Sequence, residues 1–201
     1  FKNYPINLWQ ASNEHQFITG LNEAFTRAKH DTVFFISNDI FLMPGCIQEI
    51  RRLANEFPDD IFQPTLLNED NSIQNMGLDW MWPAYSIGRT SMAYEGSYFE
   101  TDLFTTAAFW MSKTTFNQVG EFDTKFAPAY YEDMDYSFRA KALGNKLYVS
   151  EFSRVKHIGS HSFSKVKTKR EISKLCSQHR QYFISKHFKG GDRLLRLAVA
   201  A

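Results

Sequence analysis

The stretch VFFISND, residues 33–39, joins four consecutive apolar residues to three polar ones. A continuous apolar run of this length predicts a strand over 33–36 that is buried on both faces of a sheet. The run ends abruptly at Ser37, and in open α/β sheets ligands bind outside the carboxyl ends of strands. The carboxylate of Asp39 suits a hard divalent cation, which in turn holds phosphate oxygens. An ordinary polar turn before a helix explains the same residues and remains an open alternative at this point.

Strand and helix patterns alternate on both sides of this stretch. Upstream, the sequence predicts a strand over 6–9 and a helix from the Ser12-Asn13 caps to about Lys29. Downstream, Pro44-Gly45 opens a second helix, whose apolar residues recur as far as Phe57. Two strands, a helix and a short strand are then expected at residues 61–67, 107–111, 132–143 and 147–149. This alternation is typical of an α/β protein with a parallel sheet.

The composition excludes several classes of protein. The 201 residues suit one domain with a tail, and we divide them into 1–164 and a basic helical tail at 165–201. Lys and Arg number 23 against 22 Asp and Glu, so no basic field favours nucleic acid as a partner. Cys46 and Cys176 are too far apart for a disulfide scaffold or a Cys-rich zinc site, and they indicate a reducing compartment. The aromatic content of 16% includes side chains that could stack on sugar rings.

A second polar cluster, YYEDMD at residues 130–135, places three carboxylates within four residues at a helix start. The helix dipole alone favours one or two of them there, without any function. A carboxylate can also act as a general base that takes a proton from a hydroxyl. Asp135 lies four residues before Arg139, so we expect these two to pair on the helix surface. The chemistry is therefore assigned to Asp133 or Glu132.

Two histidines, His157 and His161, follow the short strand predicted at 147–149. A neutral imidazole at this point could complete a metal site. A histidine of an ordinary loop is the alternative, and two histidines within five residues favour the metal site only slightly.

Five segments, taken in order, resemble the motifs of one enzyme family. They are residues 34–40 followed by Pro44-Gly45, then 119–123, 131–139, 155–157 with Ser162, and 179–183. These resemble a strand that ends in Asp-x-Asp or Asn-x-Asp, a Gly-Gly-Phe-Asp segment, a Glu-Asp-x-Asp helix, a His followed by Ser, and Arg-Asn-x-Tyr-Phe. Together they resemble a family 2 glycosyltransferase of the GT-A fold, most closely the bacterial rhamnosyltransferase-like branch. The resemblance implies a Rossmann-like, mostly parallel mixed sheet flanked by helices.

The resemblance also implies roles for individual residues. Asn38 and Asp39 would bind the nucleotide-sugar donor, with Asp39 and His157 holding Mg²⁺ or Mn²⁺ on its diphosphate. Ala107 and Ala108 would leave room for the donor sugar. Asp133 would be the base that deprotonates the acceptor hydroxyl, which attacks the anomeric carbon with inversion, and Glu132 would support it. The acceptor would be a saccharide or a lipid-linked sugar, in cell-surface polysaccharide synthesis.

The sequence departs from the family pattern at three points, one of which is Gln16, where the family usually has Gly. Ser37 stands where the family often has Asp or Asn, and the family's first strand, helix and second strand should precede Phe1. The resemblance therefore implies an N-terminally incomplete sequence that is inactive by itself if those parts are missing. A non-catalytic remnant that binds saccharide or a partner remains an alternative. So does a metal-dependent phosphohydrolase using Asp39 and Asp133, which needs a second carboxylate near Asp39.

The basic tail has two interpretations. Lys165, Lys167, Lys169 and Arg170 could meet an anionic membrane surface, which would place a cytoplasmic protein at the inner face of the membrane. The alternative is a solvated helix that packs one apolar stripe on the domain. No apolar run approaches about 18 residues, so the sequence predicts no membrane-spanning helix.

Overall fold

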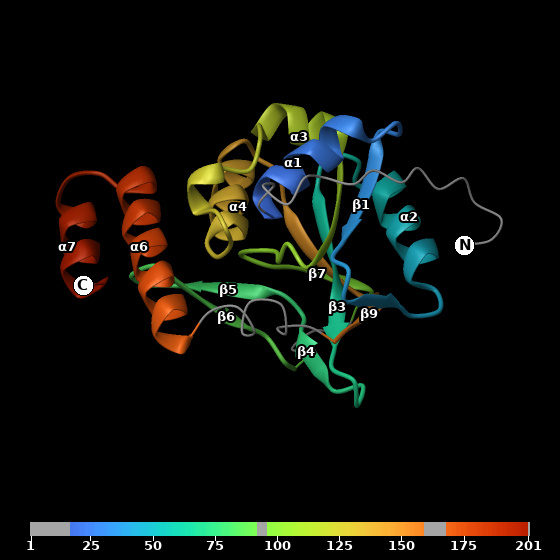
Figure 1. Cartoon of the computed structure of the whole chain (residues 1–201). Helices are drawn as coiled ribbons and strands as arrows, with labels where there is room; N and C mark the ends of the chain where they lie inside the picture. The colour runs from blue at the N-terminus through green and yellow to red at the C-terminus, as the bar shows by residue number, and fades with distance from the viewer. Residues whose placement is uncertain (1–16, 92–95, 159–167, 201) are drawn as a thin grey trace.

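The computed structural model describes residues 17–91, 96–158 and 168–200 (Figure 1). The predicted strand over 6–9 and the Ser12-Asn13 caps lie outside these ranges. The described strands are β1 (Thr32–Ile36), β2 (Ile40–Leu42), β3 (Ile61–Leu67), β4 (Ile73–Asn75), β5 (Leu78–Met81), β6 (Tyr85–Gly88), β7 (Tyr98–Glu100), β8 (Ala108–Ser112) and β9 (Leu147–His157). The helices are α1 (Phe17–Arg27), α2 (Cys46–Glu56), α3 (Lys113–Val119), the short η1 (Thr124–Phe126), α4 (Glu132–Ala142), α6 (Lys169–His187) and α7 (Gly190–Ala200).

Seven of these strands form one mixed sheet. Its path runs β1-β8-β3-β9-β2, with β4 beside β3 and β7 beside β9. β3 and β9 pair in parallel, whereas β8 runs antiparallel to both of its neighbours, β1 and β3. The predicted fold class, a mixed sheet flanked by helices, is confirmed. The share of parallel pairing is smaller than the alternation of strands and helices predicted, because the chain returns through β8 between β1 and β3.

Helices cover both faces of this sheet, and each face has its own apolar core (Figure 1). Along β8 the side chains alternate, as in any strand: Trp110 joins the cluster under α2, and Phe109 joins the cluster under α1, α3 and α4. The helix α2 begins after Gly45, at φ 85°, and buries Ile50, Leu53 and Ala54 of its predicted apolar stripe, whereas Ile47 is exposed. The sheet is therefore fixed from both sides, which holds its strand ends in place.

Two strands differ from the sequence predictions. The predicted burial of β1 on both faces is wrong: Thr32 and Ile36 are exposed and the residues between them are half-buried, because β1 lies at an edge of the described sheet. The predicted short strand at 147–149 is the start of β9, which continues as far as His157. Beyond Ser150, the buried residues Ser153 and Val155 alternate with more exposed neighbours. Because most residues of this part are polar, the apolar pattern of the sequence does not indicate that the strand continues.

The C-terminal helix α6 packs on the main core. Its Phe183 and Ile184 are fully buried in the same cluster as the apolar residues of α1, α3 and α4. The hairpin β5–β6 reaches toward α6 and α7, where Arg196 of α7 donates a hydrogen bond of 2.7 Å to the carbonyl oxygen of Pro83 (Figure 1). Among the described helices, none is long and apolar enough to span a bilayer.

Candidate active site

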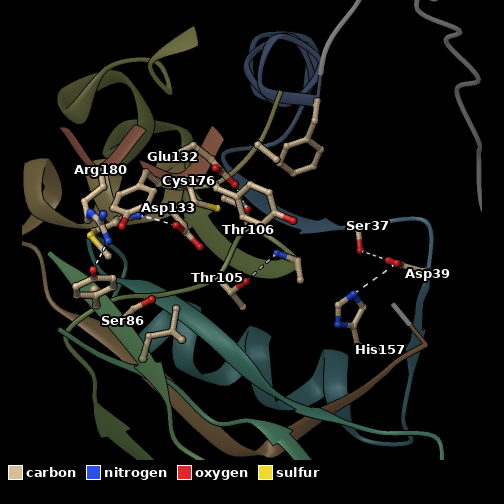
Figure 2. A pocket seen from close by; sticks show the side chains of 18 of the residues that line it. Ser37, Asp39, Ser86, Thr105, Thr106, Glu132, Asp133, His157, Cys176 and Arg180 are labelled. Carbon is tan, nitrogen blue, oxygen red and sulfur yellow. Dashed lines mark hydrogen bonds and ion pairs between the residues drawn. The ribbon is translucent and has the colours of Figure 1, made fainter. Parts of the chain in front are cut away.

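A pocket of about 800 Å³ opens at the strand ends and continues toward α6 (Figure 2). Its volume lies within the usual range for small-molecule sites. Most of the residues predicted from sequence line it, although they come from four separate segments: Asn38, Asp39, Ala107, Glu132, Asp133 and His157. The fold therefore brings the three polar clusters of the sequence into one cavity.

Ala108 is the exception among the predicted donor-binding residues. It is fully buried and packs in the cluster under α2, on the same face of β8 as Trp110. A side chain without exposed surface cannot touch a donor, so the prediction for Ala108 is wrong. Ala107, one residue before the strand, does line the pocket.

Asp39 and His157 meet at one end of the pocket because β2 pairs with β9. Ile40 lies opposite His157 in this antiparallel pair, and the backbone N–H of Ile158 donates to the carbonyl oxygen of Asp39 at 3.0 Å. The Nε2 atom of His157 then lies 3.5 Å from Oδ2 of Asp39. Ser37, the departure from the family pattern, donates a hydrogen bond from its hydroxyl to Oδ1 of Asp39.

The residues at this end fit a divalent cation. Nδ1 of His157 lies 2.7 Å from Oε1 of Gln74, and this amide oxygen can only accept. With its proton on Nδ1, the ring would donate to this oxygen and present Nε2 toward Asp39, the arrangement of a metal-ligating histidine. No group of three or more His, Cys, Asp or Glu gathers around a possible ion in the ranges described. Asp39 and His157 would thus supply two ligands, which leaves further positions for phosphate oxygens and water.

Glu132 and Asp133 lie in the middle of the pocket, at the start of α4. The two residues before them, Tyr130 and Tyr131, have φ values of 76° and 74°, which is a strained conformation for tyrosine. Contacts from other elements hold this turn. The hydroxyl of Tyr131 donates to the carbonyl oxygen of Ala84 at 2.9 Å, and Nδ1 of His179 lies 3.0 Å from the carbonyl oxygen of Tyr130. The strained turn aims the two carboxylates into the cavity (Figure 2).

The two carboxyl groups have different surroundings. Glu132 is only 4% exposed, and its Oε1 accepts a hydrogen bond of 2.9 Å from the hydroxyl of Thr106. Burial raises the pKa of Glu132, and the neighbouring charge of Asp133 raises it further. Burial also raises the pKa of Asp133, although a hydrogen bond from the backbone N–H of Met134 opposes this. Glu132 therefore holds a proton more tightly than Asp133, which is the better candidate for an ionised base.

Asp135 faces away from this chemistry. The predicted pair with Arg139 is confirmed, with Nε 2.9 Å from Oδ2 of Asp135. The same carboxylate also binds Lys186 at 2.7 Å and His187 at 2.8 Å, both on α6. Asp135 is fully buried, so it ties α4 to α6 rather than lying on the helix surface.

The far end of the pocket was not foreseen from the sequence. It is formed by Tyr85 and Ser86 of β6 and by Cys176 and Arg180 of α6. Sequence reasoning placed the stretch at 179–183 in the family pattern without a role. The packing of α6 against the hairpin is a tertiary contact that no local pattern signals.

Gln74 and Thr106 are two further residues that sequence reasoning missed. Gln74 reaches His157 only through the pairing of β4 with β3 and of β3 with β9. Thr106 had a weak signal, because it is a polar residue directly before an apolar strand.

The mixed sheet, with helices on both faces and an acidic pocket at its strand ends, has the fold of the GT-A glycosyltransferases. A crystal structure of GalNAc-T7 with UDP, GalNAc and Mn²⁺ is similar to this chain with a TM-score of 0.61 and 14% sequence identity. The similarity covers 72% of this chain and 31% of that one, so this chain spans about a third of its length. No family model matches the sequence, and no curated protein matches it.

Proposed function

We propose that this protein transfers a sugar from a nucleotide-sugar donor to a hydroxyl group of a saccharide or lipid-linked acceptor. One observation carries the proposal: the Asp39–His157 pair and the Glu132–Asp133 pair line the same pocket, in a fold of the GT-A type. The first pair has the donors for a cation, and the second has the groups for acid–base chemistry. GalNAc-T7, the similar structure, was crystallised with UDP, GalNAc and Mn²⁺, which supports the same class of donor.

The donor diphosphate belongs at the Asp39 end. Mg²⁺ or Mn²⁺, when bound there, would neutralise the charge that develops on the leaving diphosphate. Asp39 and His157 would hold the cation, and Ser37 and Gln74 would fix the orientation of these two side chains. Ala107 leaves room for the donor sugar because its side chain is small.

Asp133 is proposed as the base. Its carboxylate takes the proton of the acceptor hydroxyl while that oxygen forms a bond to the anomeric carbon. The bond from the anomeric carbon to the diphosphate oxygen breaks, and its electron pair leaves with the diphosphate. A single displacement of this kind inverts the anomeric configuration. Glu132 holds its proton more tightly and is therefore a neutral group beside Asp133. It supports Asp133 because it adds no second negative charge next to the base.

The wider setting is also a proposal. That the protein is a bacterial rhamnosyltransferase-like enzyme of surface polysaccharide synthesis, working in the cytoplasm at the membrane, is a proposal that rests on the sequence resemblance alone. The division into a catalytic part at 1–164 and a tail at 165–201 likewise stands as a proposal, although α6 shares the main core. Lys165 and Lys167, which were expected to meet anionic lipid, lie outside the described residues.

Calorimetric titration of uridine, guanosine and thymidine diphosphates, with and without Mn²⁺, tests the proposed function. We expect one of them to bind only with Mn²⁺, and Asp39→Ala to weaken that binding by about tenfold or more, since even outer-sphere partners of a metal contribute this much. Asp70→Ala, which removes an exposed carboxylate outside the pocket, is the matched control. Chelation of Mn²⁺ should reproduce the effect of Asp39→Ala. Affinity that is the same in Asp39→Ala as in the unmodified chain would contradict the metal site.

The same titration separates the alternatives. A saccharide-binding remnant would bind sugars but no nucleoside diphosphate with Mn²⁺. A phosphohydrolase would need a second carboxylate beside Asp39, and in the described ranges no group of three or more His, Cys, Asp or Glu is placed to hold a metal ion.

A further inference from the structure

A second cavity, of about 210 Å³, lies where the strand β5 meets the helix α4. Its described lining consists of Trp80 on β5, Asp102 after β7, and Phe138 and Lys141 on α4. None of these four residues lines the candidate active site. The volume lies below the usual range for drug-sized ligands, so the cavity suits a single small ring.

The indole ring of Trp80 forms a fixed aromatic wall of this cavity. It packs edge-on against Phe138, with ring centres 5.8 Å apart, and is tilted by only 25° from the ring of Phe188 at 6.2 Å. The guanidinium carbon of Arg196 lies 5.0 Å from the ring centre of Trp80 and 4.0 Å from that of Phe188. Because these side chains hold the indole in place, a ligand that packs on it has little ordering to impose.

Asp102 and Lys141 form the polar edge of the cavity. Oδ2 of Asp102 accepts a hydrogen bond of 3.2 Å from the backbone N–H of Trp80, and Oδ1 lies 3.3 Å from Nζ of Lys141. The side chains of Asp102 and Lys141 are 48% and 38% exposed, so a ligand can reach both. A carboxylate has about four acceptor positions and an ammonium group three donors, which leaves each of them capacity for a ligand.

This combination of groups favours a neutral ligand that carries hydroxyls. The charges of Asp102 and Lys141 cancel, so an ion in the cavity would meet one charge of its own sign. A hydroxyl group can both donate and accept, so neighbouring hydroxyls of one ring can donate to Asp102 and accept from Lys141. The carbon face of the same ring can pack on the indole of Trp80. A sugar ring has both features.

We propose that Trp80, Asp102, Phe138 and Lys141 form a second sugar-binding site, which holds one neutral ring of a saccharide and takes no part in catalysis. The helix α4 carries both Asp133 of the candidate active site and Lys141 of this one, about 12 Å apart along the helix axis. A saccharide held at the second site therefore stays close to the first. The inference goes beyond the proposed function and does not depend on it.

Protein-observed NMR titrations test the site with methyl glycosides of glucose, galactose, mannose and N-acetylglucosamine. The indole N–H signal of Trp80 and the backbone signal of Lys141 report on the second site, whereas the backbone signals of Ala107 and Asp133 report on the candidate active site. We expect at least one glycoside to shift the first two signals saturably at about millimolar concentration, the affinity scale for so small a ligand. The shifts should persist with UDP and Mg²⁺ present. Free phenylalanine, a zwitterion with a ring, should bind more weakly.

Two variants decide whether these side chains are responsible. Asp102→Asn keeps an oxygen that can accept from the backbone N–H of Trp80, and should weaken glycoside binding by about three- to tenfold, because the ligand loses a hydrogen bond to a charged group. Trp80→Leu should weaken it by about tenfold, because the aromatic contact is lost. The matched controls Asp70→Asn and Trp82→Leu change exposed residues outside both cavities and should bind as the unmodified chain does.

The second site is wrong if none of the four glycosides shifts the Trp80 signal saturably, or if the shifts are confined to the candidate active site. Binding that survives both Asp102→Asn and Trp80→Leu would also overturn it, and Asp102→Asn decides alone if Trp80→Leu does not fold. Tighter binding of phenylalanine than of every glycoside would assign the cavity to a zwitterion instead. Nucleotide binding does not enter these results, so the second site and the proposed function can fail separately.

Discussion

Glu132 and Asp133 combine deep burial with adjacent negative charges at a helix start. Burial raises the pKa of both groups, because the charged form loses its hydration. The helix dipole, which from the sequence alone favours ionised carboxylates here, is therefore not the dominant influence on Glu132. One carboxyl group that keeps its proton beside one that gives it up is a common arrangement in acid–base sites.

The pH dependence of stability should reveal Glu132. A carboxyl group whose pKa is raised on folding stabilises the fold below its ordinary value of 4.5, and this contribution is lost as pH rises through the raised pKa. We expect the free energy of unfolding to fall between about pH 5 and about pH 8, and Glu132→Gln to flatten this slope. Urea denaturation at both pH values measures it. A slope that is identical in Glu132→Gln and in the unmodified chain would show that Glu132 is not the group responsible.

At the scale of elements, α4 and α6 together position the pocket. The helix α4 carries Glu132 and Asp133, and α6 carries Arg180 and supports the strained turn through His179. Asp135 pairs with Arg139 on its own helix and joins α4 to α6 through Lys186 and His187. Burial by itself raises the pKa of Asp135, but hydrogen bonds from His187 and Lys186 outweigh this and hold the pKa below its ordinary value.

Asp135→Asn should therefore destabilise the protein strongly. Loss of one partner of a buried ionic network costs up to about 3–5 kcal/mol. Lys186 keeps its pair with Asp123 in the variant, so we expect a cost toward the lower end of this range. The control Glu56→Gln breaks a pair with Arg52 in which both side chains are 45% exposed, and should cost less than about 1 kcal/mol. Chemical denaturation compares the two variants. Since the pKa of Asp135 is lowered, its contribution to the free energy of unfolding should be present above the ordinary Asp pKa and lost in acid. Equal losses of stability in the two variants at neutral pH would show that the Asp135 network does not stabilise the fold.

At the scale of the whole molecule, much of the fold could be predicted from periodicity and capping. The helices α2 and α4 and the strands β3 and β8 lie close to where the apolar patterns put them. The strand order could not be predicted, because it depends on contacts between distant segments. The insertion of β8 between β1 and β3 and the full length of β9 are of this kind.

The residues of the candidate site also fall into those that local sequence patterns predict and those that depend on contacts between distant segments. Asp39, Glu132, Asp133 and His157 could be found because each belongs to a polar cluster at the end of an apolar or helical pattern. The residues that orient them, such as Gln74 and Thr106, come from strand pairing and have little or no local signal. Ala108 shows the opposite error, since a small residue at a strand start was assigned to the pocket although the alternation of the strand directs it into the core.

The most direct test of the proposed chemistry is the rate of nucleoside diphosphate release by Asp133→Asn. The rate is measured at saturating nucleotide sugar with Mn²⁺ and a mixture of saccharide acceptors, so that differences in donor affinity do not contribute. We predict a fall of about 10²–10⁴-fold, the usual loss when a general base is removed, with Mn²⁺-dependent nucleotide binding retained. Asp70→Asn, outside the pocket, should release nucleotide at the normal rate. A near-normal rate in Asp133→Asn would contradict the assignment of the base.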